Sequence, residues 1–137
     1  MTLVSLLLGV VLAVVFLALA RLRKQRDWLV VAIGLPVAGL AYVGFALMAG
    51  NGRWAAYEAV GVLVYGLVAW CGLRRSPRWL VLGWAAHPLW DTLLHLSGTG
   101  AELAPQWYVV SCVPFDLLVA GFIAARPQIP RSDASAP

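Results

Sequence analysis

Charged residues are scarce in this sequence. Asp, Glu, Lys and Arg make up 12% of the 137 residues, whereas hydrophobic residues make up 62%. A typical soluble domain contains about 25% charged residues. The composition therefore excludes a soluble globular domain and indicates an integral membrane protein, with the lipid bilayer as its surroundings.

Lysine is nearly absent, and the arginines do not form a nucleic-acid-binding face. Nine of the ten Lys and Arg residues fall within residues 21–26, residues 74–78 and residues 126–131. Basic clusters between apolar segments are typical of the cytoplasmic loops of multispanning proteins. We therefore expect no nucleic acid as a partner, although the formal net charge is +4.

Cysteine occurs only twice, as Cys71 and Cys112. In the membrane spans predicted below, these residues lie in opposite halves of the bilayer, separated in depth by about 15 Å. The Cα atoms of a disulfide lie about 4.4–6.8 Å apart. The sequence therefore predicts two free, buried thiols rather than a disulfide.

Apolar segments occupy almost the whole length. Each is close to the roughly 20 residues that an α-helix needs to cross the hydrocarbon core of a bilayer. The sequence predicts an all-α integral membrane bundle of five transmembrane helices, formed by a single domain at residues 1–125 and followed by a disordered cytoplasmic tail at residues 126–137. The predicted spans are residues 2–20, 28–48, 54–73, 79–96 and 106–125.

The basic clusters also predict an orientation. If they lie inside, the N-terminus lies outside, the C-terminus is cytoplasmic and Arg53 is exposed outside. Trp28 and Trp79 then lie at the inner interface, and Trp54 and Trp107 at the outer one, as an aromatic belt requires. The distributions of charged and aromatic residues thus indicate the same topology.

Three ionisable residues interrupt the fourth predicted span. His87, Asp91 and His95 follow one another at four-residue steps, which in an α-helix places them on one face. An ionisable group at membrane depth costs about 2.5–3.5 kcal/mol on insertion scales. A cluster of such groups is therefore expected to serve a function.

Two further carboxylates are predicted at similar depth. Glu58 lies about 6 Å below the outer end of its span, and Asp116 about 15 Å below the outer end of the fifth. Pro88 and Pro114 each free a backbone carbonyl near a polar residue. We expect a small polar cavity between the last three helices, lined by the five candidate site residues Glu58, His87, Asp91, His95 and Asp116.

These residue types suit several chemistries. A divalent transition metal such as Zn, Fe or Mn fits Asp91 with one of the two histidines, completed by Asp116 or Glu58, and the favoured set is His87, Asp91 and Asp116. His87 and His95 lie about 12 Å apart along the helix, too far to share one ion. Acid/base catalysis by the same residues is an alternative, as is a proton relay from the surface to the centre. Glu58 and His95 can also be interfacial residues only.

The segment GWxxHxxWDxxxH, residues 83–95, resembles a family of small bacterial integral membrane proteins of unknown function. A looser likeness extends from Trp54 to the segment Cys112-x-x-x-Asp116. In that family a second His often precedes the position of His95, where this sequence has Leu94. The resemblance implies a multipass protein of the bacterial cytoplasmic (inner) membrane and implies site roles for His87, His95 and the two aspartates.

Taken together, the sequence favours a membrane-embedded enzyme that acts on a lipid or isoprenoid-like substrate by metal-assisted or acid/base chemistry. A small transporter or proton-coupled membrane component is the alternative, and it is expected to be a homo-oligomer because five short helices enclose little volume. A third alternative is a structural or assembly subunit of a membrane complex.

Overall fold

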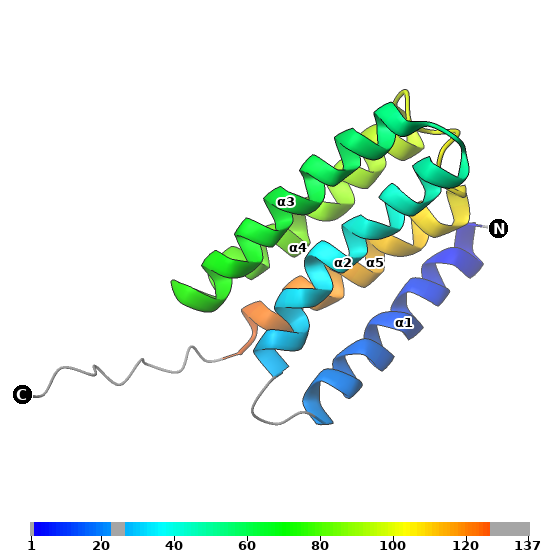
Figure 1. The fold of residues 1–137 in the computed structure, drawn as a ribbon. Helices are drawn as coiled ribbons and strands as arrows, with labels where there is room; N and C mark the ends of the chain where they lie inside the picture. The colour runs from blue at the N-terminus through cyan, green and yellow to red at the C-terminus, as the bar shows by residue number, and fades with distance from the viewer. Residues whose placement is uncertain (1, 23–26, 127–137) are drawn as a thin grey trace, which may run out of the picture.

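The computed structural model describes residues 2–22 and 27–126, and over these residues the chain is helical with short connections. Successive helices run in opposite directions and pack side by side (Figure 1). The elements are α1 (Thr2–Leu22), α2 (Asp27–Met48), α3 (Gly52–Arg74), α4 (Arg78–Asp91), the short π-helix η1 (Thr92–Leu96) and α5 (Gln106–Ala124).

Four of these helices, α1, α2, α3 and α5, are long and apolar enough to cross a membrane. Their ends agree with the predicted spans to within two residues. Such helices indicate a membrane protein because the bilayer core accepts only backbone whose polar groups are satisfied internally.

The fourth predicted span, residues 79–96, differs from the expected uninterrupted α-helix. It is divided into α4, which has 14 residues, and η1, which has 5. Pro88 cannot donate a backbone hydrogen bond, and the Thr92 hydroxyl donates to the Pro88 carbonyl at 2.6 Å. From Thr92 onward the bonding widens, and the Ser97 N–H donates to the Thr92 carbonyl five residues earlier at 3.1 Å.

Of the predicted tail at residues 126–137, the structure describes Arg126. Its guanidinium pairs with the Asp27 carboxylate and lies over the rings of Trp28 and Phe122. This contact joins the start of α2 to the end of α5. Residues 127–137 and the loop residues 23–26 lie outside the described part of the chain.

The turn between α2 and α3 uses two residues suited to it. Gly50 has a φ of 68°, a left-handed conformation that side chains with a Cβ rarely adopt. Asn51 then caps α3, its Oδ1 accepting from the Trp54 N–H at 3.2 Å. The turn lets α3 return antiparallel to α2 (Figure 1).

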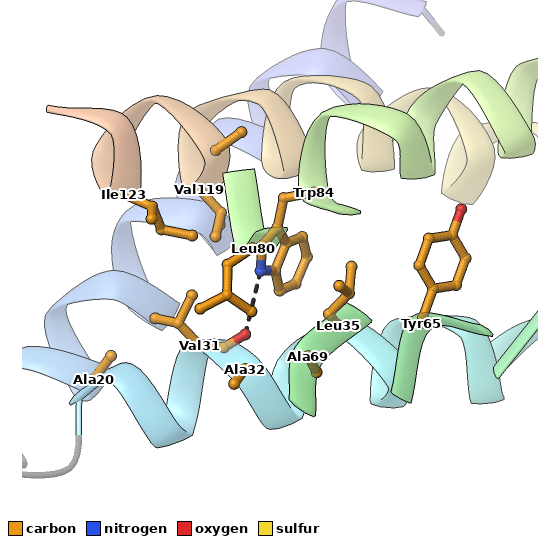
Figure 2. Packing of buried hydrophobic residues seen from close by; sticks show 11 residues of the cluster. Ala20, Val31, Ala32, Leu35, Tyr65, Ala69, Leu80, Trp84, Val119 and Ile123 are labelled. Carbon is orange, nitrogen blue, oxygen red and sulfur yellow. Dashed lines mark hydrogen bonds between the residues drawn. The ribbon is translucent and has the colours of Figure 1, made fainter. Parts of the chain in front are cut away.

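One apolar cluster fills the half of the bundle nearest the basic loops. Figure 2 shows side chains of this cluster, which come from all five α-helices and surround the fully buried Trp84. The Trp84 indole N–H donates to the Val31 carbonyl at 3.2 Å, which ties α4 to α2. In the other half of the bundle, ionisable side chains occupy much of the interior.

The N-terminal helix α1 packs mainly on α5. A Cβ added at Gly9 would lie 2.0 Å from the Ser111 carbonyl oxygen, so the two backbones meet at this point. Close approach at small residues is the usual way in which helices associate inside a membrane.

Candidate functional site

All five candidate site residues are buried, and none exposes more than 2% of its surface. They come from four elements: Glu58 from α3, His87 and Asp91 from α4, His95 from η1 and Asp116 from α5. The structure brings them together as two adjacent groups rather than one.

The first group, the His87–Asp91–Asp116 triad, joins α4 to α5. The Nδ1 atom of His87 lies 3.0 Å from Asp116 Oδ2 and 3.4 Å from Asp91 Oδ2. His87 and Asp91 stand one helical turn apart, so α4 presents both to the same point. Asp116 reaches that point from the facing helix.

Several polar atoms of this triad have no hydrogen-bond partner within the described residues. They are His87 Nε2 and both carboxylate oxygens of Asp91. Buried polar atoms are normally satisfied, since leaving one unpaired costs about 1–3 kcal/mol and more for a charged group. Two buried carboxylates that share one imidazole therefore leave a negative site, which a cation or a proton would neutralise.

The triad can hold a metal ion. One ligand atom from each of its three residues can be chosen so that all three lie within 4.8 Å of one another. Ligands bound to one ion at about 2.0–2.2 Å stand no more than about 4 Å apart, so small side-chain movements would complete the set. The donor set of one imidazole and two carboxylates suits Zn, Fe or Mn.

The second group is the Glu58–His95 pair. Glu58 Oε1 and His95 Nε2 are 3.1 Å apart, although they are not aligned as a hydrogen bond. His95 Nδ1 lies 3.3 Å from the Gly100 carbonyl, and the Trp90 indole N–H donates to Glu58 Oε2 at 3.4 Å. Glu58 and His95 are thus buried inside the bundle and held by several contacts.

The π-helix changes the direction of the polar stripe after Asp91. In a continuous α-helix, His95 would lie on the same face as His87 and about 12 Å from it. The wider turn of η1 changes the angular step after Asp91, and His95 contacts Glu58 of α3. Such π-helical turns occur frequently at functional sites.

Aromatic rings enclose both groups. The Tyr42 ring stacks on His95 at 4.3 Å between centroids and lies 6.3 Å from His87. Its hydroxyl donates to Cys112 Sγ at 3.9 Å. The Tyr65 ring lies 4.9 Å from His87. Tyr42 therefore stands between the two groups.

Tyr42 was not among the residues predicted for the site. The sequence placed the site between the last three helices, whereas Tyr42 comes from α2. Its lone hydroxyl within an otherwise apolar segment was the only available signal, and such tyrosines are more often packing residues.

Comparison with known proteins adds the family but no activity. No curated protein and no solved structure matches this chain. Residues 1–128 match a family of unknown function, DUF6010. Because the match covers all of the described residues, the chain belongs to the DUF6010 family.

Proposed function

We propose that this protein is a membrane-embedded enzyme that acts on a lipid or isoprenoid-like substrate with the help of a divalent transition metal. The observation that carries the proposal is the buried His87–Asp91–Asp116 triad, in which several nitrogen and oxygen atoms that could bind a metal have no hydrogen-bond partner among the described residues. A purely structural triad would be expected to satisfy its own hydrogen bonds.

The three residues of the triad would each supply a ligand to the metal. An ion with three protein ligands retains coordination positions for a substrate oxygen, as catalytic sites require. Bound there, the metal would act as a Lewis acid on a carbonyl or phosphoryl oxygen. The Glu58–His95 pair would supply acid/base groups beside the metal.

The position of the triad inside an apolar bundle supports a lipid substrate. The surrounding helices are apolar on the outside, and exposed leucines and valines cover α1, α2 and α3. A water-soluble metabolite would have to cross that surface, whereas a lipid reaches it by diffusion in the bilayer. We further propose that the protein lies in a bacterial cytoplasmic membrane. Its basic loops support an orientation with the N-terminus outside and the C-terminus inside.

The enzyme proposal is tested by incubating purified protein with the lipid extract of its host and comparing lipid masses. Wild-type protein should change the mass of at least one lipid, and Asp91→Asn should not. Glu102→Gln, which alters an exposed carboxylate in the loop before α5, should match the wild type. Identical lipid profiles with and without wild-type protein, at full metal occupancy, would contradict an enzymatic function.

A proton-coupled transport function is the second candidate. It is favoured by the continuous series of buried groups from Glu58 and His95 past Tyr42 to the triad. Chains of Asp, Glu and His are characteristic of intramembrane proton relays. Proton flux into liposomes that is lost in His95→Gln would favour this candidate, and its absence in wild type would exclude it.

A further inference from the structure

An apolar groove runs between α3 and α4 on the surface that faces the lipid. It has a volume of about 250 Å³ and is lined from α3 by Gly61, Val64 and Val68, and from α4 by Leu82, Ala86 and Trp90, among others. Tyr65 forms part of its floor. Its lining is almost entirely apolar, so the groove suits a hydrocarbon chain.

A second, polar hollow lies at the start of α3. It measures about 300 Å³ and is lined by Asn51, Arg53, Trp54, Tyr57 and Thr99. Arg53 forms no ion pair with any other residue that the structure describes. The side-chain oxygen Oδ1 of Asn51 already accepts a hydrogen bond at the start of α3, which leaves the side-chain NH₂ group of Asn51 as a donor. The hollow therefore presents a cation and hydrogen-bond donors, the partners of an anion.

The polar hollow and the apolar groove follow one another along the same face of α3. Tyr57 of the hollow and Gly61 of the groove are four residues apart, one helical turn, or about 6 Å. From Arg53 to Val68 the distance along the helix is about 22 Å. One amphipathic molecule with an anionic head and a single long chain would occupy both.

The walls of this surface also contact the buried site. Trp90 lines the groove and donates to Glu58, while Tyr65 lines it and packs on His87. Trp54, in the polar hollow, lies 6.0 Å from His95 between ring centroids. Movement of these aromatic side chains would connect the groove with the interior.

We infer that the hollow and groove along α3 bind a lipid with a phosphate head group and one long chain. The phosphate lies against Arg53, and the chain lies over Gly61 and Val64 toward Val68. This inference rests on the proposed function, since it names the substrate class of the enzyme, and it adds the surface from which that substrate approaches.

Native mass spectrometry of the detergent-purified full chain tests the inference with geranylgeranyl phosphate as the probe and geranylgeraniol as its uncharged counterpart. Wild-type protein should bind the phosphate about tenfold more tightly than the alcohol, and Arg53→Gln should lose that preference. Val64→Trp should weaken binding of both because it fills the groove. Leu63→Trp, an exposed neighbour that does not line the groove, should bind as the wild type does.

The inference is overturned if the wild type shows no preference for the phosphate, or if Leu63→Trp and Val64→Trp behave alike. Metal content measured on the same samples separates this outcome from a failure of the proposed enzyme. Arg53→Gln and Val64→Trp should keep the metal, since neither residue contacts the triad. Metal without the lipid preference contradicts the lipid site alone, whereas the lipid preference without metal supports the lipid site and contradicts the metal enzyme.

Discussion

At the scale of single residues, Asp91 is the residue whose substitution best distinguishes a functional role from a stabilising one. It is completely buried, and neither carboxylate oxygen has a hydrogen-bond partner within the described residues. A buried carboxyl group in that state does not stabilise the fold, because the free-energy cost of its desolvation exceeds the free energy gained from one contact with His87. We therefore interpret Asp91 as a residue retained for what it binds.

Replacement of Asp91 by leucine should accordingly stabilise the metal-free protein. We expect the free energy of unfolding to rise by about 1–3 kcal/mol, since a buried polar group without a hydrogen-bond partner is exchanged for an apolar side chain of the same branched shape. Thermal unfolding in detergent with a chelator present measures the change. Asp27→Leu is the matched control, and it should destabilise the protein because it removes the partner of Arg126. A fall in stability for Asp91→Leu as large as that for Asp27→Leu would show that Asp91 is structural.

Trp84 provides the opposite case, a residue whose role is packing. Its ring is fully buried, and its indole N–H donates to the Val31 carbonyl. Trp84→Phe removes both ring volume and the hydrogen bond, so we expect a loss of about 2–4 kcal/mol. Metal content should stay at the wild-type value, which elemental analysis of the folded fraction would verify. Loss of metal without loss of stability would place Trp84 in the site instead.

At the scale of the elements, the sequence predicts four of the helices closely and does not predict the π-helix or the contribution of α2 to the site. The ends of α1, α2, α3 and α5 follow from the length of the apolar segments and from turn residues such as Gly50 and Asn51. The π-helix η1 follows only in part, because the Thr92–Pro88 hydrogen bond is local whereas the contact of His95 with Glu58 of α3 is tertiary. The same limit applies to Tyr42, whose place beside His95 is a tertiary contact that periodicity does not encode.

The packing of α1 on α5 gives a prediction for an element as a whole. Gly9→Val should displace α1, because a Cβ at this position would lie 2.0 Å from a backbone oxygen. We expect a loss of about 3 kcal/mol or more. Gly44→Val is the control, since nothing lies within 4 Å of a Cβ added there, and it should change stability by less than about 1 kcal/mol. Equal melting temperatures for the two variants in detergent would contradict the observed helix pairing.

At the scale of the whole molecule, the buried polar site and the apolar core occupy different halves of the bundle. Trp84 and its neighbours fill the half near the basic loops, and the ionisable residues fill much of the other. Depth along each helix predicts that the ionisable residues lie in one half and the centre of the bundle, and the distance of about 12 Å between His87 and His95 predicts that His95 lies apart from the triad. Depth does not predict the stacking of Tyr42 on His95, because that contact depends on which helix faces which.

Orientation in the membrane is a further prediction at this scale. In a background without Cys71 and Cys112, a cysteine at Thr99 should react with a membrane-impermeant maleimide in intact cells. A cysteine at Ser76 should react only after permeabilisation, because the basic loop that contains it is expected to be cytoplasmic. The reverse pattern of labelling would invert the topology and place Arg53 in the cytoplasm.

The most direct measurement is elemental analysis of the detergent-purified protein, because the central claim is that the His87–Asp91–Asp116 triad binds a transition metal. We expect near-stoichiometric Zn, Fe or Mn in the wild type and loss of that metal in His87→Ala and Asp91→Ala. Glu58→Gln, a change of a buried carboxylate outside the triad, should keep it. A wild type without metal, or variants that retain it in full, would contradict the claim and leave a proton as the cation that neutralises the site.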